Sequence, residues 1–171
     1  IVRRGGMAAL TARSLAAELG SSAKPVFGLF ENMQEVQDEV VRAANAEYQS
    51  FLRAEMMRGA YPPYKASGIA YIAFARKEKE LFKLLFMRDR TEEDSETEDE
   101  SIDGIIALIS RNTGLSNEDA RLFHLEMWIF VHGIATMIVT GYLDWEEEYV
   151  SRTLTDVYEG LKARWCGGNG K

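Results

Sequence analysis

The sequence predicts an all-α protein, in which a three-helix, helix-turn-helix head is followed by a helical body that dimerises. Three observations carry this prediction. Two short helical patterns meet at a glycine-serine turn within residues 10–33. Apolar residues then recur at i, i+3 and i+4 along most of the chain, between helix caps and glycine or proline stops. Residues 127–137, within the helical segment before the last, are too apolar to be covered by one subunit alone.

The composition indicates a globular protein with an uneven distribution of charge. The chain has 171 residues, 46% of them apolar, so it can bury a sizeable core. Its net charge is −7, yet residues 1–34 carry four basic and two acidic side chains. A mildly basic head on an acidic body suits a protein that contacts nucleic-acid phosphates with one end only.

Several features favour a cytoplasmic location. The single cysteine, Cys166, excludes a disulfide framework and indicates a reducing compartment. No signal peptide is visible, and the longest apolar run, Met127 to Met137, is too short to cross a bilayer. We therefore expect no membrane contact. Because the chain starts at Ile1 rather than at a methionine, we also expect that an N-terminal piece is missing.

The first two helices of the head follow from their caps. Residues 1–4, which precede Gly5 and Gly6, are typical of the last turn of a helix and its glycine stop. Thr11 is a suitable cap for a second helix. The apolar stripe of that helix consists of Leu15, Ala16 and Leu19.

A turn and a third short helix complete the predicted head. Gly20-Ser21-Ser22 forms a three-residue break in which the glycine can adopt a positive φ. Ser22 is expected to cap the third helix, and Val26, Leu29 and Phe30 repeat the apolar stripe on it. This spacing is the one with which a second, recognition helix is presented to a DNA major groove.

A long helix is predicted to connect the head to the body. Asn32 is a suitable N-cap, and Glu35 follows at the position of a capping box. The apolar rhythm continues to about Met57, and Gly59 and the Pro62-Pro63 pair end it. We place the DNA-binding domain at residues 1–45 and the ligand-binding and dimerisation domain at residues 46–171.

The body is predicted to contain five helices, at 63–77, 81–87, 102–112, 117–142 and 146–165. Between the second and third of these, residues 91–101 carry seven acidic side chains and are expected to form a solvated loop. Aromatic residues are dense in the first two body helices. They belong either to the core or, for some of them, to a pocket.

The last two helices predict a homodimer. Residues 127–137 are apolar almost all the way round, so the helix must be covered on several sides. The final helix is amphipathic. Pairing of both helices with their symmetry mates would form an isologous four-helix interface.

The sequence does not favour catalysis or metal binding. His124, Trp128 and His132 share one face of a helix, but the two histidines are two turns apart, too far to bind one metal. His132 is expected to be a hydrogen-bonded core histidine, with a polar contact to a ligand as the alternative. There is no nucleophile-base spacing, glycine-rich phosphate loop or His-Glu metal motif. We predict neither an enzyme nor a cofactor.

These residues carry a family resemblance. The stretch LTARSLAAELGSSAKPVFGLFENMQEV, residues 10–36, resembles the DNA-binding head of the tetracycline-repressor (TetR) family of bacterial transcriptional regulators. The order W-x3-H-G, formed by Trp128, His132 and Gly133, is similar to one C-terminal variant of that family. The resemblance implies a homodimeric repressor whose third helix enters the major groove of operator DNA and which a small molecule releases.

The resemblance also implies which residues contact DNA, with Lys24 the best candidate for a base or phosphate contact. They are Thr11, Arg13, Ser21, Ser22, Ala23, Lys24, Pro25, Phe27 and Gly28. The chain departs from the family at Phe27, Leu29 and Met33, which are apolar where relatives are polar. The second hypothesis is therefore a helical ligand-binding or interaction dimer with a weakened or vestigial head.

The ligand site is predicted from helical faces. Its candidate residues are Met56, Tyr71, Phe74, Phe86, Trp128 and His132. A cluster rich in aromatic rings and methionine suits an apolar or aromatic effector.

Overall fold

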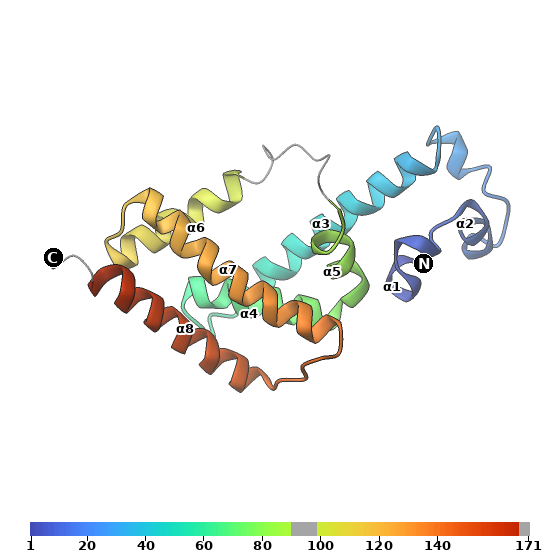
Figure 1. Cartoon of the computed structure of the whole chain (residues 1–171). Coiled ribbons are helices and arrows are strands. Elements are labelled where there is room, and N and C mark those ends of the chain that lie inside the picture. Colours follow the sequence, from blue (N-terminus) through green and yellow to red (C-terminus); the bar gives the residue numbers. More distant parts are fainter. Residues whose placement is uncertain (90–98, 168–171) are drawn as a thin grey trace.

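The computed structural model describes residues 1–89 and 99–167 and confirms the all-α prediction. Its described part contains eight α-helices and two 3₁₀ turns, and no strand (Figure 1). Figure 1 shows a helical body and, at the right, a small head beside the start of the long helix α3. The helices are α1 (Val2–Gly5), α2 (Ala12–Glu18), α3 (Met33–Met57), α4 (Pro63–Lys77), α5 (Lys79–Phe86), α6 (Asp99–Thr113), α7 (Asn117–Val139) and α8 (Glu147–Gly167).

The start and end of α2 agree with the predicted caps. Thr11 Oγ1 accepts a hydrogen bond from the Ser14 backbone N–H, and Ser14 Oγ accepts one from the Thr11 N–H. At the other end, Gly20 adopts a φ of 63°. The Ser21 N–H donates to the Ala16 carbonyl and the Gly20 N–H to the Ala17 carbonyl, which is the pattern of a Schellman motif.

The predicted third helix of the head is wrong in its length and in its cap. Only the 3₁₀ turn η2 (Val26–Gly28) forms, and it begins after Pro25 with no side-chain cap from Ser22. Proline disfavours helical backbone before it, and Gly28 lowers helix propensity three residues later, so too few residues remain for an α-helix. Val26 and Phe30 pack against the core cluster as expected, but Leu29 is 83% exposed.

Helix α3 has the predicted bounds and a different capping arrangement. The Asn32 side chain accepts from the Glu35 N–H, as predicted. The Glu35 carboxylate accepts from the N–H of Glu31 rather than from that of Asn32, so the capping box is displaced by one residue. The helix continues without a break through residue 45, where we placed the domain boundary.

The head and the body share one hydrophobic cluster. Val2 and Leu10 of the head belong to the same cluster of buried residues as Phe74 of α4 and Ile138 of α7. Within the body α4 is central, because it packs against α3, α5, α6, α7 and α8. A second, smaller cluster joins α6 to α7 around Phe123.

Two further boundaries differ from those predicted. Helix α7 ends at Val139 instead of near Tyr142, because Gly141 adopts a φ of 75° and the Tyr142 N–H turns back to the Met137 carbonyl. Residues 91–98 of the predicted acidic loop lie outside the described residues. The backbone from Asp99 onward is already helical, so the loop prediction is wrong for residues 99–101.

One described helix, α7, is long and apolar enough to cross a membrane by length and composition alone. Core helices of globular proteins meet the same criterion, and α7 contributes Phe123, Met127 and Ile134 to the two hydrophobic clusters. Its other side leaves apolar side chains exposed, with exposed fractions of 49% for Leu125 and 58% for Ile129.

Candidate functional site

The basic side chains of the head divide into two groups. Arg3 pairs with Glu47 and Glu78, and Arg4 pairs with Glu18. Arg13, in the first turn of α2, and Lys24, just before η2, are both exposed and make no ion pair with the described residues. Two positive charges are therefore available at the outer end of the head in a chain that is acidic overall.

The other predicted DNA-contacting residues lie at the start of α2, in the turn after it and around η2. Thr11 is exposed, although its hydroxyl is already engaged as the cap of α2. The Ser21 hydroxyl donates to the Ser22 carbonyl at 3.2 Å. Ala23 is half-buried, whereas Pro25, Phe27 and Gly28 are exposed. None of the nine residues is buried, so all remain accessible at one end of the molecule.

Two ion pairs of Arg3, which the sequence did not predict, connect the head to the body. Arg3 Nε donates to Glu78 Oε2 at 2.9 Å, and the Arg3 guanidinium also contacts Glu47 of α3. Glu78 joins α4 to α5, and its side chain is only 16% exposed. One arginine of α1 thus bonds to α3 and to the corner between α4 and α5.

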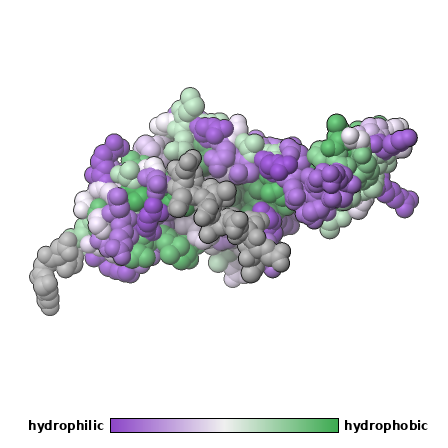
Figure 2. Space-filling view, turned by 90° about the horizontal axis from the view of Figure 1, so that it is seen from above, coloured by the Kyte–Doolittle hydropathy of each residue, from purple (hydrophilic) through white to green (hydrophobic). Residues whose placement is uncertain are grey.

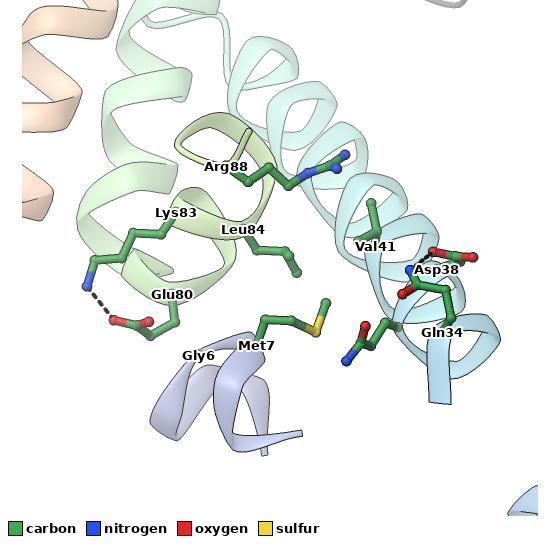
Figure 3. Close-up of a pocket in the computed structure, with 10 residues that line it drawn as sticks. Gly6, Met7, Gln34, Asp38, Val41, Glu80, Lys83, Leu84 and Arg88 are labelled. Atoms are coloured by element: carbon green, nitrogen blue, oxygen red, sulfur yellow. Dashed lines mark hydrogen bonds and ion pairs between the residues drawn. The ribbon is translucent and has the colours of Figure 1, made fainter. Parts of the chain in front are cut away.

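A cavity of about 360 Å³ opens at this junction (Figure 3). Met7 of the 3₁₀ turn η1 (Met7–Ala9), Val41 of α3 and Leu84 of α5 form its apolar part. Gln34 and Asp38 are hydrogen-bonded to each other on one side, and Glu80 and Lys83 are paired on the other. No periodic pattern in the sequence indicates this cavity, because it depends on how α1 sits on α5.

Most of the predicted ligand-site residues meet in an aromatic cluster. The Tyr71 hydroxyl lies 2.8 Å from His132 Nδ1. The rings of Trp128 and His132 are stacked with centroids 4.9 Å apart and an interplanar angle of 14°. Phe86 packs 5.0 Å from Tyr71. Tyr71 is buried and Trp128 is 41% exposed, so the cluster reaches from the core to the surface.

The remaining two predicted residues lie at the margins of this cluster. Phe74 is fully buried and packs on Tyr48, which in turn contacts Tyr71 and Phe86. Met56 is in the last turn of α3 and 36% exposed. Neither the junction cavity nor a second cavity of about 450 Å³ between α4 and α8 is lined by any of the six residues.

Two tyrosine–histidine hydrogen bonds connect α4 to α7. Besides Tyr71 and His132, the Tyr64 hydroxyl lies 3.0 Å from His124 Nδ1. Burial lowers the pKa of both histidines below the ordinary value of 6.5 and raises the pKa of both tyrosines. At neutral pH all four groups are therefore uncharged. His132 is hydrogen-bonded, as expected, but it is half-buried rather than part of the fully buried core.

Helix α5 lies between the aromatic cluster and the head. Its Phe82 ring is stacked on His132 with centroids 6.0 Å apart, and Phe86 contacts Tyr71. The same helix packs against α1 and contributes Leu84 and Lys83 to the junction cavity. Helix α5 therefore contacts both the aromatic cluster and the head.

The architecture is that of a two-part regulator, with a small exposed head containing a helix and a turn at one end of an all-helical body. Residues 64–158, which run from α4 into α8, match the tetracyclin repressor-like C-terminal domain. The match covers more than half of the chain, so the protein belongs to the tetracyclin repressor-like family. This membership indicates a regulatory protein rather than an enzyme. A search of curated proteins gave no match.

Proposed function

We propose that the protein is a ligand-responsive, homodimeric transcriptional repressor that a small molecule releases from its operator. The observation that carries the proposal is the pair of exposed basic side chains, Arg13 and Lys24, on the head of a family member whose net charge is −7. An acidic chain that keeps two cations without an internal carboxylate at one tip is suited to binding phosphate there.

In this proposal the body binds an apolar or aromatic effector at the aromatic cluster. Trp128 stacks on His132 at the surface, and His132 contacts Tyr71 and Phe82 in the interior. An aromatic molecule that inserts beside His132 would displace Phe82, and with it α5. Because α5 packs against α1, the two heads of a dimer would change their orientation relative to each other.

The dimer forms through α7 and α8. Leu122, Leu125 and Ile129 make an exposed apolar stripe on α7 at i, i+3 and i+7. Gly160 lies on α8 where a β-carbon would meet nothing within 4 Å, which permits close approach of a second helix. Such an isologous interface would place two identical heads on one DNA duplex. We place the dimer in the cytoplasm.

Fluorescence anisotropy with the DNA upstream of the protein's own gene tests the proposal. Specific binding should exceed binding to a scrambled duplex, and its affinity should fall as salt rises. Lys24→Ala should weaken binding and reduce the salt slope by about one unit, because one phosphate or base contact is lost. Equal binding to both duplexes at every salt concentration would contradict the proposal.

The alternative is a helical ligand-binding or interaction dimer whose head no longer binds DNA. The shortness of η2 and the exposed side chains of Phe27 and Leu29 favour it. It predicts that an aromatic ligand binds with the same affinity in the presence and absence of operator DNA. Specific operator binding eliminates this alternative.

A further inference from the structure

The segment that follows the turn of the head is almost devoid of hydrogen-bonding side chains. Residues 23–29, here called the reading segment, have the sequence AKPVFGL. Lys24 is its single polar side chain. Ser21 precedes the segment, and its hydroxyl is already donated to the Ser22 carbonyl.

The apolar side chains of the reading segment face outward as well as inward. Val26 packs against the core cluster. Phe27 is 39% exposed and Leu29 is 83% exposed, and Pro25 is exposed as well. Figure 2 shows apolar side chains on the surface at the head end, on the right, beside hydrophilic ones. Burial in the core therefore does not account for these three residues.

The partner of this surface follows from the charges that flank it. Arg13 and Lys24, which are the two cations of the head without an ion pair to the described residues, lie in α2 and in the reading segment. Positive charge beside an apolar face complements a duplex, whose phosphates line a groove that contains methyl groups. A purely apolar protein partner would leave both cations without a counter-charge.

The chemistry of the segment limits what it can read in the major groove. Guanine, adenine and cytosine are distinguished there by hydrogen-bond donors and acceptors, whereas thymine also presents a 5-methyl group. Apolar side chains can recognise only that methyl group. Lys24 can supply one polar contact, to a guanine or to a phosphate.

We propose that the head recognises its operator mainly through thymine 5-methyl groups, which Pro25, Phe27 and Leu29 contact. This inference rests on the proposed function, because it requires specific binding to duplex DNA. On this inference, the apolar side chains of Phe27 and Leu29 recognise methyl groups of the DNA, and their lack of polar groups does not mean that the head has lost DNA binding.

Deoxyuridine tests the inference, because it differs from thymidine only by the missing 5-methyl group. A binding site is first selected from random duplexes with the full chain. Each thymine of the half-site is then replaced by deoxyuridine, and Kd is measured by anisotropy. Each contacted thymine should cost about three- to fivefold in affinity, the value expected for one buried methyl group.

Two variants separate methyl recognition from general DNA affinity. Phe27→Ala should bring the affinity ratio between thymidine and deoxyuridine sites close to one at the position that Phe27 contacts. Lys24→Ala, the matched control in the same segment, should weaken binding to both sites and leave the ratio unchanged. Circular dichroism checks that both variants keep the helical content of the parent.

The outcomes distinguish the inference from the function on which it rests. A selected site that binds equally well with deoxyuridine throughout overturns methyl recognition and leaves the repressor proposal intact. Failure to select any sequence overturns both. A Phe27→Ala variant that keeps the full thymidine preference removes Phe27 from the recognition surface, and the same measurement on Leu29→Ala then decides for that residue.

Discussion

Replacing Arg3 by glutamine should loosen the head from the body. Arg3 is the residue of α1 that bonds to both Glu47 and Glu78, so the variant removes two charge-assisted contacts between the head and the body. Arg4→Gln provides a matched control, because the neighbouring arginine pairs with Glu18 inside the head. The two variants make the same chemical change at adjacent positions.

The expected cost follows from the surroundings of Glu78. Its carboxylate is 16% exposed, so loss of Arg3 leaves a largely covered charge without its counter-ion. The Arg3 side chain is 54% exposed, and solvent screens part of the interaction. We therefore expect a loss of about 1–2 kcal/mol in the free energy of unfolding. For a domain of this size, that loss lowers Tm by about 3–6 °C.

Two measurements check this prediction. Thermal unfolding followed by circular dichroism gives the change in Tm. Electron–electron distance measurements between spin labels at Ala17→Cys and Ala107→Cys, with Cys166 replaced by serine, give the position of the head relative to α6. The distance distribution should be narrow in the parent and in Arg4→Gln, and broad in Arg3→Gln. Equal distributions for all three proteins would refute the idea that Arg3 orients the head.

Three further predictions concern pH, the turn and the dimer. The pKa values of His124 and His132 are lowered in the folded state, so below pH 6.5 the folded state binds fewer protons than the unfolded state. The stability that the two histidines contribute is therefore complete above pH 6.5 and is lost as pH falls through their lowered pKa values. Urea unfolding from pH 7 to pH 5 should show a steeper loss for the parent than for a double glutamine variant, and parallel curves would contradict this. Gly20→Ala, at a φ of 63°, should lower the free energy of unfolding by about 1–2 kcal/mol, measured by thermal unfolding. Gly28→Ala, the control, should change Tm little. Equal effects of the two substitutions would exclude backbone strain at Gly20 as the cause. Ile129→Glu should convert the dimer to a monomer in sedimentation velocity, and a dimer that persists would exclude α7 from the interface.

Local patterns predicted most of the helices correctly. Thr11, Asn32 and Ser116 each accept from a backbone N–H three residues later, so a short polar side chain was a sufficient signal for these helix starts. The stops at Gly20 and Gly59 are also local, because both adopt positive φ. Ser22 failed as a cap because Pro25 and Gly28 lie within the next six residues and outweigh it.

The junction between head and body could not be predicted in the same way. The pairing of Arg3 with Glu78 joins residues 75 positions apart, and no spacing rule connects them. The sequence pattern predicted part of the aromatic cluster, because Trp128 and His132 lie on the same face of one helix. Its partners Tyr71 and Phe82 follow only from the packing of α4 and α5 against α7. The six proposed ligand-site residues stay a prediction that effector binding will test.

The single hydrophobic cluster that joins Val2 and Leu10 to Phe74 and Ile138 bears on how such a protein can be recombined. A chimera made by cutting at residue 45 would divide α3 one residue after buried Ala44 and separate the head from most of the side chains that cover it. Head and body should therefore unfold together in one cooperative transition rather than as two modules. An exchange of DNA specificity between relatives should succeed with the turn and reading segment alone, because Val26 is the one residue among 20–29 that packs against the shared cluster, and it is only partly buried.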